Sequence, residues 1–303
     1  MNLDLSSIKT VKGILIKYGV KPSMGMGQNF LVNREVLEKI VKSADLKSDD
    51  TILEIGPGIG TLTQKLAEKT ERVVAVEKDN RMCQILKETL KDYKNTEIIN
   101  DDILKIKNLK LEQVPRVREQ ISNYKIVANI PYYLTSPLIR KFLENPPNGK
   151  QPEKIILMVQ KEVAQRICAN PPNMTHSAGS GSSRANRGMS ILAVSVQFYA
   201  KAKIISYIKK ENFWPAPKVD SAIIKITPHK NNISISSELF FKIVKAGFSQ
   251  PRKQLGNNFL KMLKLDKQKI NLWLSKNNIS PAQRAETLSV DDWKNLLSTA
   301  SHF

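Results

Sequence analysis

The segment TILEIGPGIGTLTQKLAEK (51–69) joins a short apolar run to a glycine-rich turn and then to a helical pattern. The run 51–55 is typical of a buried strand, and 61–69 has the spacing of a helix. Gly56, Gly58 and Gly60 allow a tight turn and a close approach of backbone to a ligand. A strand, a glycine turn and a helix in this order indicate an α/β sheet, in which ligands bind at the carboxyl ends of the strands.

Strand-like and helix-like segments alternate along the chain on both sides of this turn. Apolar residues recur with helical spacing over 33–46, where Asn33 is a suitable cap. Helices are also expected around 80–92, 136–144 and 161–169. Further strands are expected at 72–79, 96–101, 124–129 and 154–160. This alternation predicts a doubly wound, parallel α/β sheet.

The pattern changes in the second half of the chain. Residues 170–188 are rich in Pro, Gly, Ser and Asn, which predicts a mobile loop. Residues 191–208 and 220–228 are expected to be strands that complete the sheet. From about residue 233 the pattern is helical, with helices expected at 237–248, 252–263, 267–277 and 290–300. We therefore expect a first domain over 1–228 and a small all-helical domain over 229–303.

The chain has 48 Lys and Arg against 28 Asp and Glu, a formal charge of +20. This surplus favours a polyanion or an anionic membrane surface as partner, although a lysine-rich solvated surface is the alternative. No signal-peptide pattern opens the sequence, and no apolar run reaches the length of a membrane span. Cys83 and Cys168 and the scattered histidines form no metal or disulfide pattern. We expect a cytoplasmic monomer without a metal.

Two acidic residues follow the predicted strands next to the glycine turn. Glu77 ends its strand 21 positions after Gly56, where a carboxylate can accept both hydroxyls of a ribose. Asp102 ends the next strand, where it can accept from an adenine amino group. A dinucleotide site would need glycine at position 61, which is Thr61. Glycines at alternate positions with Glu54 before them suit a nucleoside without pyrophosphate, and S-adenosylmethionine is the predicted cofactor.

The segment NIPYY (129–133) follows another predicted strand, and its residues suit methyl transfer to an exocyclic base amine. The side-chain carbonyl of Asn129 can accept one N–H, and the backbone carbonyl of Ile130 or Pro131 can accept the other. Pro131 fixes φ and so preorganises this backbone. Tyr132 can stack on the base. Two acceptors aim the amine lone pair at a donor methyl without a strong general base. The alternative is a structural turn in which Asn129 is only a cap.

These motifs together resemble the small-subunit ribosomal RNA adenine N6,N6-dimethyltransferases, a family of class I methyltransferases, over about residues 20–300. GQNFLVN (27–33) resembles the N-terminal signature of the family, and the resemblance implies donor contacts from Gln28, Asn29 and Leu31. LEIGPGIGTLT (53–63) resembles its donor loop. The resemblance further implies that Gly56 and Gly58 contact the donor, that Glu77 binds its ribose and that Asp102 binds its adenine. It implies a catalytic role for Asn129.

The resemblance also implies how the substrate is held. FWPAPKVDSAII (213–224) resembles the family segment whose aromatic residue, here Phe213, faces the target base opposite Tyr132. Lys218 in this segment is a candidate for RNA contact. FSQPRKQLGNNF (248–259) resembles a basic stretch that contacts RNA, with Arg252 and Lys253 as candidates. RAETLS (284–289) also matches the family.

The function that the resemblance implies is dimethylation of two adjacent adenosines near the 3′ end of small-subunit rRNA, late in subunit assembly. The long link over 170–188 and the spelling NIPY depart from the usual family pattern. NIPY is also frequent in large-subunit rRNA methyltransferases that confer macrolide resistance, which is the second hypothesis. A third is an RNA-binding assembly or transcription factor that kept the fold and lost the chemistry. A small-molecule methyltransferase leaves the basic helices of the last domain unexplained.

Overall fold

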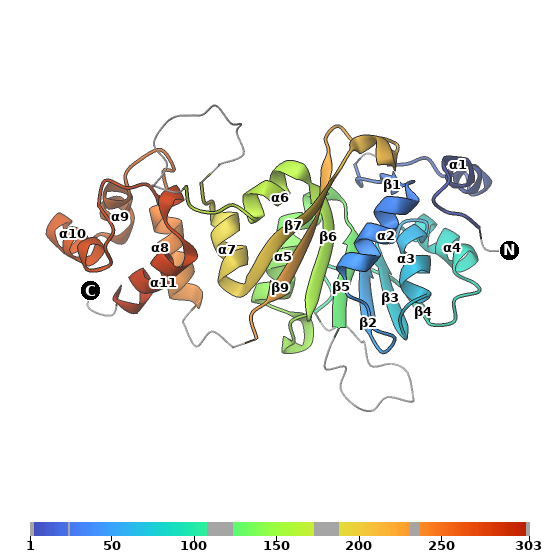
Figure 1. Ribbon diagram of the computed structural model, residues 1–303, viewed down its shortest axis with the longest axis horizontal. Helices are drawn as coiled ribbons and strands as arrows, with labels where there is room; N and C mark the ends of the chain where they lie inside the picture. The colour runs from blue at the N-terminus through green and yellow to red at the C-terminus, as the bar shows by residue number, and fades with distance from the viewer. Residues whose placement is uncertain (1–2, 24, 108–123, 173–187, 231–236, 301–303) are drawn as a thin grey trace. The chain divides into compact units, whose positions relative to one another are not determined.

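A computed structural model describes residues 3–23, 25–107, 124–172, 188–230 and 237–300. The chain divides into two compact units (Figure 1). The first combines Met1–Ala164 with Lys201–Pro228, and the second combines Gln165–Ala200 with His229–Phe303. The units change at residue 228, where a domain boundary is predicted, but residues 165–200 cluster with the second unit. Most of the predicted loop 170–188 lies outside the described residues.

The first unit is built on a seven-stranded sheet. Its strand order is β4 (Thr96–Asn100), β3 (Arg72–Glu77), β2 (Thr51–Ile55), β5 (Tyr124–Asn129), β6 (Lys154–Gln160), β9 (Ser221–Pro228) and β7 (Ala200–Ile208). The strands from β4 to β6 are parallel, whereas β9 is antiparallel to β6. The expected α/β fold is confirmed, but the expectation of an all-parallel sheet is wrong at β9. The connection from β7 to β9, residues 209–220, contains no α-helix that could cross over the sheet, so β9 returns in the opposite direction.

Helices cover the sheet because alternate strand residues face opposite sides. α2 (Arg34–Ser43) and α3 (Thr61–Ala67) share a core with Ile52, Val73 and Val127. Asn33 caps α2 as predicted, its side chain accepting from the Val36 N–H at 3.1 Å. The other predicted helices that were found here are α4 (Asn80–Thr89), α5 (Thr135–Glu144) and α6 (Lys161–Ile167), and the last three residues of α6 cluster with the second unit. The described residues of the first unit also form the 3₁₀ turns η1 (Tyr132–Leu134), η2 (Pro147–Gly149) and η3 (Lys210–Asn212).

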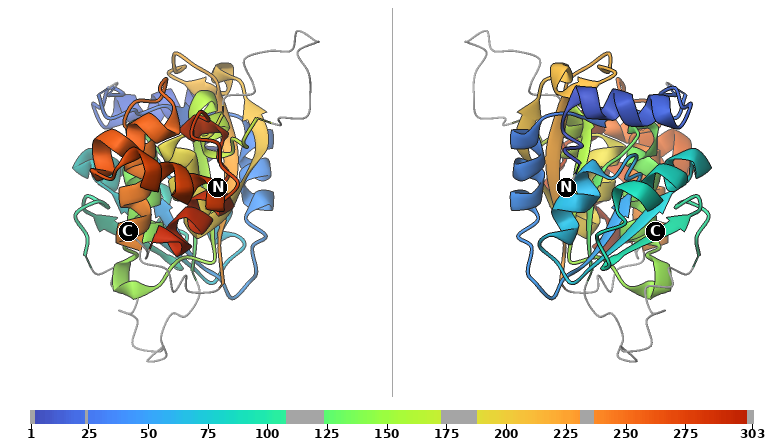
Figure 2. Two further views of the ribbon diagram at one scale, coloured as in Figure 1. Left: turned by 90° about the vertical axis from the view of Figure 1, so that its left-hand side faces the viewer. Right: turned by 90° about the vertical axis from the view of Figure 1, so that its right-hand side faces the viewer.

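Two elements near the glycine turn were not predicted. α1 (Ile8–Lys17) packs its apolar face on a cluster that includes Phe30 and Ile59. A two-stranded ladder joins β1 (Phe30–Leu31) to β8 (Phe213–Trp214). The Lys12 ammonium lies 5.3 Å from the centre of the Trp214 ring, so α1 lies beside β8 (Figure 2). These contacts bring the N-terminal segment against the loop that follows β2.

The second unit is helical. Its elements are α7 (Ile191–Tyr199), α8 (Ser237–Gly247), α9 (Leu255–Leu263), α10 (Lys267–Lys276), η4 (Ala285–Thr287) and α11 (Val290–Ser298). The predicted strand 191–208 is therefore wrong over 191–199. The side chain of Ser190 caps α7 through the Ala193 N–H, and Phe198 stacks on Phe240 with ring centres 4.0 Å apart. Burial in this aromatic core outweighs the strand preference of an apolar, partly β-branched segment.

Candidate active site

A cleft opens where β2, β3, β4 and β5 end, and we call it the strand-end cleft. Because these strands are parallel, their carboxyl ends meet at one edge of the sheet. Nine of the predicted site residues line the cleft: Gln28, Asn29, Leu31, Gly56, Gly58, Glu77, Asp102, Asn129 and Pro131. The structure therefore brings residues from five separate segments of the chain to one place.

The glycine turn forms the floor of the strand-end cleft. Gly56 and Gly58 have φ values of 66° and 60°, a region that favours glycine. A Cβ at position 58 would lie 3.2 Å from the Phe30 ring, and one at position 56 would lie 3.5 Å from Pro131. The Gly58 N–H donates to a carboxylate oxygen of Glu77 at 3.2 Å. The turn is thus fixed by its conformation and by the carboxylate beside it.

Glu77 is held rigidly at the end of β3. Glu77 is 8% exposed. The carboxylate oxygen that does not bond to Gly58 accepts from the Asp79 N–H at 2.8 Å. Burial raises the pKa of Glu77, although the N–H groups of Asp79 and Gly58 oppose this shift. Each oxygen already accepts one bond and has capacity for another. The carboxylate is therefore able to accept hydroxyls from a ligand in the cleft.

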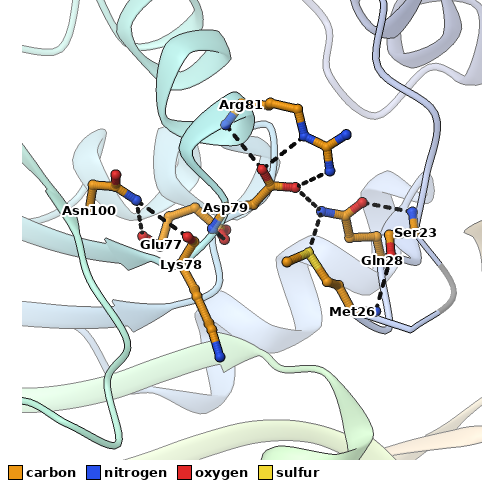
Figure 3. Close-up of polar contacts among 8 residues, drawn as sticks. All are labelled: Ser23, Met26, Gln28, Glu77, Lys78, Asp79, Arg81 and Asn100. Carbon is orange, nitrogen blue, oxygen red and sulfur yellow. Dashed lines mark hydrogen bonds and ion pairs between the residues drawn. The ribbon is translucent and has the colours of Figure 1, made fainter.

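Asp79 links three parts of the site, a role that the sequence analysis missed. Its carboxylate accepts from the Arg81 guanidinium at 2.9 Å and from the Gln28 side-chain amide at 3.0 Å (Figure 3). The side-chain carbonyl of Gln28 accepts in turn from the Ser23 N–H at 2.8 Å. The Arg81 hydrogen bonds lower the pKa of Asp79. The spacing of EKDNR (77–81) was the available signal, since Asp79 also caps α4.

Asp102 lies in the loop that follows β4. Its carboxylate accepts from the Leu104 N–H at 3.0 Å and forms an ion pair with the Lys78 ammonium at 3.0 Å. Burial opposes ionisation, but the Lys78 ion pair and the Leu104 hydrogen bond outweigh it, so the pKa of Asp102 is lowered. Lys78 is largely exposed, and its ammonium can move away to leave an oxygen of Asp102 for a ligand.

Glu54 is the most deeply buried carboxyl of the strand-end cleft. Its residue is 1% exposed, and within the described residues its Oε2 makes no hydrogen bond. Burial, together with the nearby charge of Glu77, raises the pKa of Glu54 to about 8. Glu54 therefore carries a proton at neutral pH unless a cation enters the cleft. A cationic ligand favours the ionised form of such a group.

Asn129 and Pro131 connect the end of β5 to two of the other motifs. The side-chain amide of Asn129 donates to the Asn29 carbonyl at 3.4 Å, which leaves the Asn129 side-chain carbonyl for another donor. Pro131 lies between two glycines, because a Cβ at Gly27 would be 3.0 Å from it and it also contacts Gly56. The motifs 27–33, 53–63 and 129–133 are thus packed on one another.

The structure narrows the choice of a second acceptor for a target amine. The carbonyl of Pro131 already accepts from the Leu134 N–H at 2.9 Å, where η1 begins. This leaves the carbonyl of Ile130 as the stronger candidate of the two. Asn129 and Ile130 are neighbours at the end of one strand, so both acceptors come from the same rigid element.

The three aromatic residues near the end of β5 and in β8 have different surroundings. Tyr132 is partly buried, and its hydroxyl lies 2.7 Å from that of Ser221. Phe213 is 4% exposed and packs in the core with Val36 and its neighbours. Tyr133, which the sequence analysis did not select, lines the cleft and is 56% exposed. The predicted roles of Tyr132 and Phe213 against a target base therefore stay predictions.

The three candidate RNA-binding residues are all exposed. Lys218 lies in the first unit between β8 and β9. Arg252 and Lys253 lie in the second unit, in the turn that precedes α9. Their accessibility is compatible with contacts to phosphates, and their role stays a prediction.

The charge of the strand-end cleft is opposite to that of the chain. Five acidic side chains line it against the single ammonium of Lys78, namely Glu54, Glu77, Asp79, Asp101 and Asp102, and of these Glu54 is protonated at neutral pH. A pyrophosphate would be repelled by this lining, whereas a ligand with cationic groups is attracted. S-adenosylmethionine carries a sulfonium, an ammonium and a ribose with two hydroxyls. The buried Glu54 oxygen, the Glu77 carboxylate and the glycine turn fit such a ligand.

Two further findings concern metals and membranes in the described parts of the chain. No group of three or more His, Cys, Asp or Glu residues there is placed to hold a metal ion. Among the same residues, no helix has the length and apolar character needed to cross a bilayer. Cys83 and Cys168 are free thiols.

Comparisons with known proteins agree with this geometry. A ribosomal RNA small subunit methyltransferase A from Dehalococcoides mccartyi (strain CBDB1) is 39% identical over 295 residues, covering 96% of this chain and 92% of that protein. A dimethyladenosine transferase structure from Plasmodium falciparum has a TM-score of 0.67 at 27% identity, covering 89% of this chain and 96% of that one. The structure of the 23S rRNA methyltransferase ErmE has a TM-score of 0.68 at 23% identity, covering 90% and 100%, and shows the fold alone.

The family assignment rests on the length of the match as well as on the site. The family model described as ribosomal RNA adenine dimethylase matches residues 21–301, which include the motifs around the strand-end cleft and the helices of the second unit. The cofactor of the protein is S-adenosylmethionine, and the fold is that of class I methyltransferases. This chain belongs to the ribosomal RNA adenine dimethylase family.

Proposed function

We propose that this protein transfers methyl groups from S-adenosylmethionine to the N6 amines of two adjacent adenosines near the 3′ end of small-subunit rRNA. One observation supports it above the others. Asn129 and Pro131 line the same cleft as the acidic side chains, so a cationic donor bound there lies beside the proposed acceptors of the target amine. The names of the relatives support the small subunit as substrate.

When bound, S-adenosylmethionine supplies an electrophilic methyl group on a sulfonium. Glu77 accepts the ribose hydroxyls, and Asp102 accepts from the adenine amino group once Lys78 has moved aside. Gly56 and Gly58 let the backbone approach the ligand without a side chain in between. These residues fix the position of the donor and carry no part of the proton transfer.

On the substrate side, Asn129 and Ile130 hold the target amine. The Asn129 carbonyl and the Ile130 carbonyl accept its two N–H groups, which draws the nitrogen toward a tetrahedral geometry. The bond between the Asn129 amide and Asn29 prevents the side chain from rotating away. Positioning of this kind can supply about 7–11 kcal/mol of the barrier. The amine proton leaves to water after transfer, so no strong base is required.

We also propose that RNA is gripped by exposed cations, including Lys218, Arg252 and Lys253, and that the protein acts in the cytoplasm as a monomer. The net charge of +20 supports a polyanionic substrate. An adenosine in a loop or at a helix end is easier to extrude than one in a duplex.

A label-transfer assay tests the proposed function. Purified protein and donor with a tritiated methyl group are offered separately to unmethylated small subunits and to large-subunit rRNA, and the modified base is mapped. Label recovered as dimethyladenosine near the 3′ end of small-subunit rRNA is the expected result. Label on large-subunit rRNA would establish the resistance enzyme instead. Donor binding without any transfer would favour a non-catalytic assembly factor.

A further inference from the structure

β7 exposes an unusual set of side chains on one face. Lys201, Lys203, Ile205 and Tyr207 alternate along that face, and all are exposed. Lysines on an edge strand are a common protection against strand pairing with other molecules. That function accounts for Lys201 and Lys203. It does not account for Tyr207, which is 51% exposed at the end of the strand.

Tyr207 is part of a basic group of side chains. The Lys161 ammonium lies over its ring, 5.3 Å from the ring centre. Lys209 and Lys210 follow along the chain after the buried Ile208 and are exposed. We call Lys161, Tyr207, Lys209 and Lys210 the lysine–tyrosine surface. An aromatic ring among cations is typical of surfaces on which single-stranded nucleic acids stack.

Successive contacts connect this surface to the catalytic motif. The Tyr132 hydroxyl lies 2.7 Å from the Ser221 hydroxyl. Ser221 pairs with Gln160 between β9 and β6. The next residue, Lys161, donates its backbone N–H to the Asp220 carbonyl at 3.0 Å. The lysine–tyrosine surface therefore lies on the side of Tyr132 away from β3 in the strand order, within the same unit.

Lysines outnumber acids in the strand and loop that carry most of this surface. Asp220 is occupied, since one carboxylate oxygen accepts from the Lys210 N–H at 3.2 Å and the other lies 3.9 Å from the Lys161 ammonium. Glu162 and Glu211 are the other acids close in sequence. Residues 201–220 contain five lysines against Glu211 and Asp220. A polyanion matches this charge.

We propose that the lysine–tyrosine surface binds the RNA nucleotide next to the target adenosine, with its base stacked on Tyr207 and its phosphates against Lys161, Lys209 and Lys210. This inference rests on the proposed function, because the target adenosine is taken to lie at Asn129. The surface would hold the strand beside the extruded base and so set which adenosine enters. It also accounts for an aromatic ring left exposed at the end of an edge strand.

Two sets of variants test the proposal in the full-length protein. Tyr207→Ala removes the stacking ring, and Tyr207→Phe keeps it. Lys209→Ala with Lys210→Ala removes two charges, and Lys39→Ala with Lys42→Ala, on the exposed face of α2, is the control of equal charge. Binding of unmethylated small-subunit rRNA is measured by filter titration at several salt concentrations. Donor affinity is measured by calorimetry, and methylation by single-turnover label transfer.

Tyr207→Ala should weaken RNA binding about tenfold and Tyr207→Phe little, with donor affinity unchanged in both. Replacing both Lys209 and Lys210 should lower the salt slope by about 1.4–1.8, or about 0.7–0.9 for each lost phosphate contact, and the α2 pair should leave it unchanged. RNA affinity and slope equal to wild type in both the Tyr207→Ala and lysine variants would overturn the proposal and leave the surface to a protein partner. Failure of the proposed function looks different, because wild type itself would then transfer no label to small-subunit rRNA.

Discussion

The strand-end cleft and the lysine–tyrosine surface lie on two sides of the NIPYY motif and differ in the sign of their charge. The cleft is lined by five acidic side chains, of which Glu54 is protonated, and one lysine, whereas the surface is formed by Tyr207 and three lysines. The net charge of the whole chain, +20, has the same sign as the second region and the opposite sign to the first. An average over the chain thus hides an acidic site for a cation inside a protein that binds a polyanion.

This division explains how one small unit can hold two substrates of opposite charge. RNA phosphates are excluded from the acidic cleft, and the donor gains nothing from the basic surface. The two ligands can meet only at the motif between the regions, where Asn129 and Pro131 lie. The comparison therefore predicts that variants on each side affect one ligand and spare the other.

The largest effect on the rate of methyl transfer is expected at Asn129, where the two ligands are proposed to meet. Asn129→Ala removes the side-chain acceptor for the target amine and should lower the single-turnover rate by about 10²–10³, the usual cost of losing one preorganised hydrogen bond to a transition state. Donor and RNA affinity should fall much less. Rapid-quench label transfer with saturating donor measures the rate. A variant that methylates at the wild-type rate would remove Asn129 from the mechanism.

A smaller but still large effect is expected on the cleft side. Glu77→Ala removes the carboxylate that holds Gly58 and Asp79, and each lost hydrogen bond to a charged group costs about 1.5–3 kcal/mol. Donor affinity should fall between about tenfold and several hundredfold, while the salt slope of RNA binding stays at the wild-type value. Calorimetry with donor and filter titration with RNA separate the two. Glu77→Gln, which keeps one carbonyl acceptor, should show an intermediate loss.

The sequence predicts a feature of these two regions where strand order alone produces it. It does not predict a feature that depends on contacts between side chains of distant segments. Glu77, Asp102 and Asn129 end parallel strands, so the strand order alone brings them together. The contacts between Gln28 and Asp79, or between Lys78 and Asp102, join separate segments and depend on side-chain conformations that no local pattern encodes. The cleft was therefore predictable in outline, and the groups that hold its residues in place were not.

The wrong predictions have a similar origin. The apolar segment 191–199 is compatible with a strand or a buried helix, and only its packing on Phe240 selects α7. The exposed ring of Tyr207 lay within the same predicted strand, where nothing distinguished it from a core residue. Its neighbours became visible only when β6, β9 and β7 were placed side by side. Non-local pairing, not composition, defines the basic region.

The next effect concerns the stability of the cleft without ligand. The pKa of Glu54 is about 8 in the folded protein against an ordinary value of 4.5. The folded state keeps a proton that the unfolded chain releases, so stability falls as pH rises from about 4.5 to 8. Glu54→Gln removes this dependence and should be the more stable protein at pH 8, by a few kcal/mol relative to the difference at pH 5. Urea unfolding at both pH values measures it, and parallel pH profiles would contradict it.

The smallest effect on RNA binding is expected in the second unit. The comparison of the cleft with the lysine–tyrosine surface concerns the first unit only and does not say how much the second unit contributes. Arg252→Ala with Lys253→Ala removes two exposed cations before α9 and should weaken RNA binding several-fold at moderate salt, with the salt slope lowered by about 1.4–1.8. Filter titration against unmethylated small-subunit rRNA measures both. Combining this pair with Lys209→Ala and Lys210→Ala sharpens the comparison. Additive losses would show that one RNA contacts both units independently, whereas an unchanged slope in the Arg252 and Lys253 variant would confine the RNA site to the first unit.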